Sequence, residues 1–303
     1  MIRSTLLKLS ESKAFAHWVT SNSATRRMSH RFVAGETLDE ALQAARECNS
    51  AGMFATLDYL GENVATTDDA QKARDAYLQI FDRIAQEKLS ANVSCKLTQL
   101  GLDLSVEFCE GLVLSIAERA GAYDSFLRVD MESSVYTQRT IELVKRVRSQ
   151  TPAVGTVIQS YLYRSESDVQ DLLSYGCRIR LCKGAYKESA DVAFPAKNDV
   201  DANYVKLMRL LLPSGFYHGI ATHDPRMIAE TIRCAAENKI SKDDFEFQML
   251  YGVRVDLQRR LVRDGYRVRV YIPYGQDWFP YFMRRLAERP ANLAFFVRNF
   301  LRS

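Results

Sequence analysis

The sequence predicts an α/β protein built as a (β/α)8 TIM-type barrel, and two observations carry that prediction. Short apolar runs rich in β-branched residues occur eight times, and each is followed by a segment with apolar residues at i, i+3 and i+4. The alternations occupy about 240 residues, the usual size of such a barrel. A doubly wound open sheet is the alternative, but the fingerprint G-x-G-x-x-G is absent.

The chain divides into an N-terminal helical arm, residues 1–48, and a catalytic barrel, residues 49–303. A helix opens in the arm at Glu36 and runs toward Cys48. No linker rich in Pro, Gly or Ser divides the rest. The expected strands are 52–57, 91–97, 126–131, 154–160, 177–182, 217–222, 245–250 and 266–272. The helices that follow them are expected at 68–88, 106–120, 137–149, 166–174, 201–212, 225–238, 254–263 and 277–288.

Composition and charge argue against several classes of function. The 303 residues are 47% hydrophobic and 26% charged, with a net charge of +4. The sequence has no long basic run of the kind that binds nucleic acid. It also has no apolar run of the ~18 residues that a transmembrane helix needs. Six cysteines without C-x-x-C spacing and four scattered histidines offer no metal site. We expect reduced thiols and a cytoplasmic protein.

The carboxyl ends of the expected strands are unusually polar, and in a (β/α)8 barrel the active site forms there. Lys96, Asp130 and Arg180 lie at the ends of three different strands. A buried charge is costly unless it is paired, so we expect these side chains to face one another or a ligand. A layer of inward ion pairs without chemistry is the alternative.

The last expected helix presents a face suited to a carboxylate. Tyr281, Arg284, Arg285 and Glu288 fall at i, i+3, i+4 and i+7, so they share one side of the helix. Arginine forms forked hydrogen bonds with carboxylates, and Glu288 could orient the fork. A solvated helix with an ordinary Arg/Glu pair would show the same pattern.

Two shorter signals also point to a ligand. Lys183 and Gly184 follow the fifth strand, where a cation and a close backbone approach suit a phosphate or pyrophosphate, although a tight turn explains them nearly as well. His223 alone would more often be a structural histidine. Thr222 beside it at a strand end favours ligand binding.

Taken together, these residues resemble the catalytic barrel of the proline dehydrogenases, flavoenzymes that oxidise L-proline to Δ1-pyrroline-5-carboxylate. Seven matching segments occur in family order, and together they make the match specific. They are 93–97, 129–132, 180–186, 221–223, 245–252, 269–275 and 281–288. The resemblance implies a (β/α)8 barrel whose last helix lies over the strand ends, with non-covalent FAD lining the pocket.

The resemblance also implies roles for single residues. Arg180 would lie near flavin N5 and Asp130 would order the charged pocket, which makes these two the expected catalytic residues. The flavin, its ribityl chain and its diphosphate would be held by Met131, Gln159, Arg180, Lys183, Gly184, Ala185, Thr222 and His223. The proline carboxylate would be gripped by Lys96, Arg284 and Arg285, braced by Glu288. Leu250, Tyr271 and Tyr281 would form the walls around the five-membered ring.

The implied reaction is hydride transfer from proline C5 to flavin N5, the first step of proline degradation, with electrons passed on to a membrane quinone. We expect a monofunctional enzyme, because neither an aldehyde dehydrogenase domain nor a DNA-binding module fits in this chain. A mildly basic chain with a helical arm is compatible with peripheral association at the inner face of the cell membrane. Tyr281 would crowd a ring hydroxyl, so unsubstituted L-proline is the expected substrate. No residue stands out as the catalytic base.

Two rival functions follow from the same residues. In an aldolase-like barrel, Lys96 or Lys183 would form a Schiff base with a carbonyl substrate, and the protein would be colourless. A non-catalytic carboxylate-binding or scaffold barrel would bind without turnover, a reading that the many strand-end charges disfavour.

Overall fold

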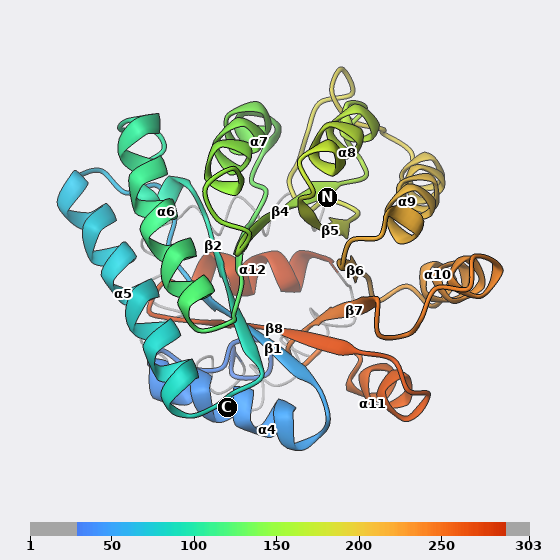
Figure 1. Cartoon of the computed structure of the whole chain (residues 1–303), viewed down its shortest axis with the longest axis horizontal. Helices are drawn as coiled ribbons and strands as arrows, with labels where there is room; N and C mark the ends of the chain where they lie inside the picture. The colour runs from blue at the N-terminus through green and yellow to red at the C-terminus, as the bar shows by residue number, and fades with distance from the viewer. Residues whose placement is uncertain (1–28, 289–303) are drawn as a thin grey trace, which may run out of the picture.

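Eight parallel strands close into a barrel in sequence order (Figure 1), in a computed structural model that describes residues 29–288 and the side chains up to Arg285. Each strand pairs with its neighbours along the chain, and β8 pairs with β1. The strands are β1 (Phe54–Tyr59), β2 (Ala91–Cys95), β3 (Leu127–Val129), β4 (Val154–Gln159), β5 (Arg178–Cys182), β6 (His218–Ala221), β7 (Phe245–Leu250) and β8 (Val268–Tyr274). The predicted barrel is confirmed.

A ring of helices surrounds the strands, and most begin or end within four residues of their predicted bounds. They are α5 (Thr67–Gln86), α6 (Val106–Ala122), α7 (Ser134–Arg148), α8 (Ser165–Ser174), α9 (Lys197–Leu211), α10 (Pro225–Glu237) and α11 (Val255–Arg263), with short 3-10 turns at Thr98–Leu100 and Leu212–Ser214. Side-chain caps fix several starts, since Thr66, Ser105 and Asp224 each accept a backbone N–H of the helix that follows.

Helix α4 (Leu38–Ser50) completes the ring from the N-terminal side. Thr37 and Glu40 form a capping box at its start. The helix packs against β1 and β8 and lies between α5 and α11 (Figure 1). It therefore fills the place where a helix following β8 would ordinarily stand. The division of the chain at residue 48 stays a prediction, and the packing of α4 favours counting this helix with the barrel.

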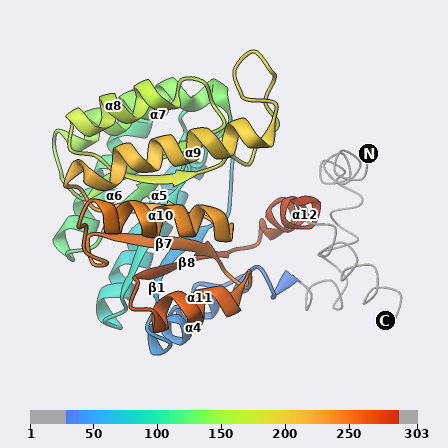
Figure 2. The same ribbon diagram turned by 90° about the vertical axis from the view of Figure 1, so that its right-hand side faces the viewer.

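Helix α12 (Trp278–Glu288) leaves β8 and crosses beyond the strand ends, as predicted (Figure 2). An apolar cluster separate from the main core holds it, in which Trp278 and Phe282 pack with Phe32 and Leu60. The rings of Phe32 and Phe282 lie 6.4 Å apart. The segment before α4 and the residue after β1 thus hold the helix above the cavity.

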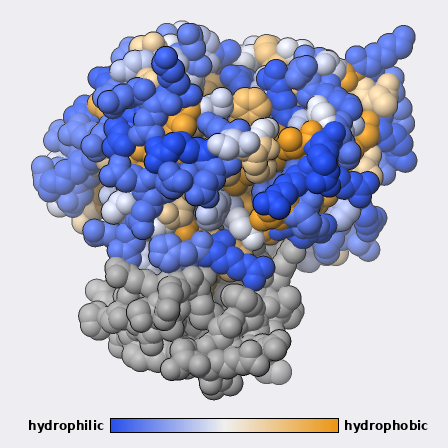
Figure 3. Space-filling view, turned by 90° about the horizontal axis from the view of Figure 1, so that it is seen from below, coloured by the Kyte–Doolittle hydropathy of each residue, from blue (hydrophilic) through white to orange (hydrophobic). Residues whose placement is uncertain are grey.

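One face of the ring of helices is mainly polar. On the face that carries α4 and α11, hydrophilic side chains predominate and hydrophobic ones gather in the gaps between them (Figure 3). The apolar sides of the helices and strands form the main core, with Leu57, Val93 and Leu181 completely buried. Within residues 29–288, no helix has both the length and the hydropathy needed to cross a bilayer.

Candidate active site

A cavity of about 630 Å³ opens at the carboxyl ends of the strands, under α12. Every predicted site residue whose side chain the structure describes lines it. These are Lys96, Asp130, Met131, Gln159, Arg180, Lys183, Gly184, Ala185, Thr222, His223, Leu250, Tyr271, Tyr281, Arg284 and Arg285. Glu288 ends α12, and its side chain lies outside the described part of the chain.

Arg180 is the centre of a hydrogen-bond network at the floor of the cavity. Its Nη1 donates to Asp130 Oδ1 at 2.7 Å and its Nη2 to Ser94 Oγ at 3.2 Å, while its Nε donates to Gln248. Strands β2, β5 and β7 and the end of β3 supply these side chains. These three partners fix the position of the guanidinium, and the Arg180 side chain is only 8% exposed. The positive charge is therefore already in place before a ligand binds.

Tyr271 joins this network from β8. Its hydroxyl donates to Asp130 Oδ2 at 2.6 Å, and its ring lies 5.1 Å from the Arg180 guanidinium. Burial raises the pKa of Tyr271, and the carboxylates of Asp130 and Asp58 raise it further. The phenol therefore stays a neutral donor. Asp130 and Arg180 face each other, which is one of the contacts expected from the sequence, and Tyr271, expected only as a wall of the substrate pocket, joins them.

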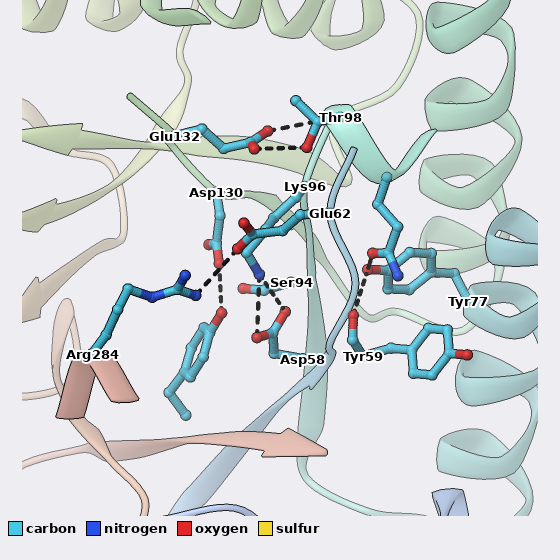
Figure 4. A network of polar contacts seen from close by, with 12 residues as sticks. Asp58, Tyr59, Glu62, Tyr77, Ser94, Lys96, Thr98, Asp130, Glu132 and Arg284 are labelled. Atoms are coloured by element: carbon cyan, nitrogen blue, oxygen red, sulfur yellow. Dashed lines mark hydrogen bonds and ion pairs between the residues drawn. The ribbon is translucent and has the colours of Figure 1, made fainter. Parts of the chain in front are cut away.

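Lys96 is paired with a residue that the sequence analysis missed. Its Nζ lies 3.1 Å from Asp58 Oδ1, and Figure 4 shows the two side chains pointing toward each other. Burial opposes the ammonium charge, but Asp58 and Asp130 outweigh it and raise the pKa of Lys96. Lys96 is thus a fixed cation.

Arg284 extends from α12 toward Glu62, which lies in the loop after β1 (Figure 4). Its Nη2 is 3.2 Å from Glu62 Oε1. Burial opposes the charge of Arg284, but Glu62 and the nearby Tyr186 raise its pKa. Arg285 lies next to it, with its guanidinium 5.2 Å from the centre of the Tyr281 ring. Two guanidinium groups and an aromatic ring therefore close the mouth of the cavity.

Lys183 and Gly184, in the segment after β5, make their close contacts with other residues of the protein. Lys183 Nζ is 2.5 Å from Asp201 Oδ1 and 2.8 Å from Asp224 Oδ2. Gly184 has a φ of +118°, and a Cβ there would collide with the ring of Tyr161. The close approach inferred from this glycine is therefore an approach to Tyr161. Both residues still line the cavity.

Three more of the predicted flavin-binding residues, Gln159, Thr222 and His223, take part in local hydrogen bonds. The Leu250 backbone N–H donates to His223 Nε2 at 2.9 Å, so this imidazole has its proton on Nδ1. Thr222 Oγ1 accepts the N–H of Asp224, the residue that caps α10. Gln159 Nε2 donates to the Glu132 carbonyl at 2.9 Å. These bonds fix the orientation of side chains that face the cavity.

Several residues of the cavity region were not predicted as site residues, and those whose polar groups contact the predicted ones or lie beside them include Asp58, Glu62, Tyr186 and Gln248. For Asp58 a signal existed, because it lies two residues after Thr56 on an alternating strand and so shares its inward face. Gln248 and Tyr186 were quoted within matching segments without a role. Glu62 follows the strand in a loop, where no periodicity marks it.

The lining of the cavity suits a flavin. Val157, Met249 and Leu250 give it an apolar part, whereas Arg180, Lys183 and Arg254 place cations around it. Apolar walls fit a planar ring system, and cations fit an anionic ring edge or a diphosphate. The volume is also in the range of small-molecule sites.

Comparisons with known proteins point to one family. A family model described as "Proline dehydrogenase" matches residues 41–298. The chain is 42% identical to Proline dehydrogenase 1 of Bacillus subtilis over 302 residues, the full length of both proteins. It is 42% identical to the proline dehydrogenase of Deinococcus radiodurans, over 91% of this chain and 90% of that one. Among solved structures, proline utilization A from Bdellovibrio bacteriovorus, inactivated by N-propargylglycine, superposes with a TM-score of 0.82 at 27% identity, covering 87% of this chain and 33% of that one.

Proposed function

The chain belongs to the proline dehydrogenase family and is an oxidoreductase of that family, and on this premise we propose that it oxidises L-proline to Δ1-pyrroline-5-carboxylate with FAD. The observation that carries the proposal is the convergence of two groups on one cavity. The network of Arg180, Asp130 and Tyr271 forms its floor, and the pair Arg284 and Arg285 forms its mouth. The substrate would lie between them.

In this proposal Arg284 and Arg285 bind the proline carboxylate through charged, forked hydrogen bonds, with Lys96 as a further cation. Tyr271, Tyr281 and Leu250 enclose the ring and exclude water from it. Binding at both ends orients proline, and orientation accounts for much of the rate in such reactions. Glu62 occupies Arg284 in this structure, so the substrate carboxylate has to compete with it.

The flavin, when bound, supplies the acceptor for a hydride from proline C5. Arg180 places a fixed positive charge beside the proposed ring position and favours an electron-rich ring. Asp130 keeps Arg180 in place and accepts the Tyr271 hydroxyl. Met131, Gln159, Lys183, Gly184, Ala185, Thr222 and His223 are the proposed contacts to the rest of the cofactor. The amine proton leaves before or during the transfer.

The Schiff-base alternative has little support from the geometry. A nucleophilic lysine has to be neutral, and burial without a partner favours that state. Lys96 instead faces Asp58 and has a raised pKa, and Lys183 lies between Asp201 and Asp224. Both amines are held as cations.

For the acceptor, we propose a membrane quinone reached by peripheral association at the inner face of the membrane. The net charge of +4 and the family support this proposal. Flotation with anionic liposomes and turnover with a short-chain quinone would test it. A protein that ignores both would contradict it.

The test of the main proposal is anaerobic addition of L-proline to the purified protein while the visible flavin band is followed. We expect a yellow protein that bleaches, which would establish flavin, substrate and direction of electron flow together. A yellow protein that does not bleach would remove the substrate assignment. A protein that stays colourless after incubation with FAD would contradict the cofactor, and borohydride trapping would then test Lys96 and Lys183.

A further inference from the structure

A second cavity, of about 360 Å³, opens at the opposite end of the barrel from α12. Its lining comes from the starts of strands, namely Phe54, Arg178, Tyr217, Arg267 and Arg269. Three of these five residues are arginines. We call this space the basal cavity. It has no part in the chemistry proposed for the other end of the strands.

Arg178 differs from the other two arginines in its partners. Arg267 Nε lies 2.8 Å from Asp243, and Arg269 Nε lies 2.6 Å from Glu246. Within residues 29–285, the Arg178 guanidinium has neither an ion pair nor a hydrogen bond, and its Nε is buried. It is held instead between two rings, 4.2 Å from the centre of Phe126 and 4.9 Å from that of Tyr217.

A fourth arginine adds to the positive charge behind the basal cavity. Arg128 is 2% exposed, and its Nη1 donates to the backbone carbonyls of Thr156 and Arg178, with no carboxylate partner among the described residues. The three lining arginines and Arg128 thus outnumber the two carboxylates that pair with them, Asp243 and Glu246. Burial lowers the pKa of Arg178, and Arg269 and Arg148 lower it further, against the opposite effect of Glu246.

We propose that the basal cavity binds a small oxyanion, a carboxylate or phosphate group, through the Arg178 guanidinium. The planar fork of arginine matches such groups, and its five donors are otherwise unused here. Stacking on Phe126 and Tyr217 fixes the plane of the fork before a ligand arrives, which lowers the entropy cost of binding. Arg267 and Arg269 line the same space and add attraction.

The basal cavity is distinct from the active-site cavity, although β5 connects them. Arg178 and Arg180 are two residues apart on this strand, so their side chains extend to the same side, one toward each end of the barrel. Arg180 is fully engaged by Asp130, Ser94 and Gln248. An oxyanion at Arg178 would therefore not need to displace anything from the proline site.

The test is thermal unfolding of the FAD-loaded protein in phosphate, in acetate and in chloride at matched ionic strength. We expect phosphate or acetate to raise the unfolding midpoint saturably by about 2–8 °C relative to chloride. The anion with the lower half-saturating concentration identifies the preferred class. Arg178→Met should lose this response, and in chloride its midpoint should not fall below that of wild type, because a partly buried cation without an ion pair has been removed.

Two control variants locate the effect. Arg233→Met removes an exposed arginine on α10, and Arg284→Met removes one at the mouth of the active-site cavity. Arg233→Met should keep the full response, and Arg284→Met should keep the part of the response that Arg178→Met loses. If Arg178→Met does not fold, Arg178→Lys, which keeps the charge without the fork, should weaken half-saturation by tenfold or more. A response equal to wild type in the Arg178 variants, a response lost in Arg284→Met, or no response from wild type to either anion would each overturn the proposal.

Discussion

Lys96 and Asp58 form an ion pair between the ends of neighbouring strands, with 3.1 Å between Nζ and Oδ1. The side chains are only 7% and 1% exposed, so water does little to screen either charge. The carboxylate is also close enough to Asp130 for the two negative charges to act on each other. Each member of the pair is therefore needed to compensate the other.

The pair can be tested by a double-mutant comparison. Lys96→Met should lower the free energy of unfolding by about 3–5 kcal/mol, because it leaves Asp58 as an uncompensated buried charge. The double variant Asp58→Asn with Lys96→Met should recover most of that loss, since neither charge remains. Urea unfolding of the FAD-loaded protein measures both. A double variant no more stable than Lys96→Met would contradict the pairing.

Arg284→Met should raise the KM for proline by roughly tenfold or more, because one charged hydrogen bond contributes about 1.5–3 kcal/mol. Arg285→Met should act in the same direction. Glu62→Gln is the matched control, since it removes the partner of Arg284 and keeps the guanidinium. We expect its KM to change less than that of the arginine variants. Unchanged KM in both arginine variants would refute the carboxylate clamp.

Arg180→Leu should lower the reduction potential of the bound flavin while the barrel persists. Loss of one charged hydrogen bond, about 1.5–3 kcal/mol, corresponds to roughly 30–65 mV for a two-electron couple. Arg180→Lys keeps the charge and should shift the potential less. Spectroelectrochemical titration measures the flavin reduction potential in wild type, Arg180→Leu and Arg180→Lys. A potential in Arg180→Leu equal to that of wild type would argue against contact between Arg180 and the flavin.

His218 should make the protein less stable in acid. Its Nδ1 accepts the Ile179 N–H and its Nε2 lies 2.9 Å from Ser214 Oγ; burial, then the charge of Arg128, lowers its pKa to about 3. The unfolded chain takes up the proton near the ordinary pKa of ~6.5. Its stabilising contribution is therefore complete above pH ~6.5 and falls by up to about 1.4 kcal/mol per pH unit as the pH drops toward 3.

The comparison protein for this effect is His218→Asn, whose amide oxygen can still accept the Ile179 N–H. Other groups also take up protons in acid, so the effect of His218 is the difference between the two proteins in how the free energy of unfolding changes with pH. We expect the stability of wild type to fall more steeply than that of the variant between pH 6.5 and pH 4 in urea unfolding. Parallel pH profiles would mean that His218 is protonated in the folded state.

The barrel was predictable because its signals are local and repeated. Alternating buried strands and amphipathic helices recur at regular spacing. Thr66, Ser105 and Asp224 are N-cap residues, whose side chains bond to a backbone N–H two or three residues further on. The meeting of Asp130 and Arg180 followed once the strands were placed, because parallel strands bring their carboxyl ends to one side, whereas the bond from Tyr271 to Asp130 was not expected.

The partners of the charged residues were harder to predict, because they depend on register and on loops. The first strand was expected at 52–57, two residues early, and this placed Asp58 outside it. Glu288 was chosen as the brace of the arginines from helical spacing, and its side chain lies outside the described part of the chain. The observed partner of Arg284 is Glu62, which is 222 residues away in the sequence. No local rule connects residues at that distance.

Helix α4 has a consequence for the order in which the protein can fold during synthesis. The helix packs on β1, which follows it directly, and on β8, which begins at Val268. At roughly 5–20 residues per second, about 10–40 s separate the translation of α4 from that of β8. During this interval the part of its apolar face that packs on β8 stays uncovered. The first helix of the ring to be made is thus among the last to be buried, and the barrel can close only after its final strand is translated.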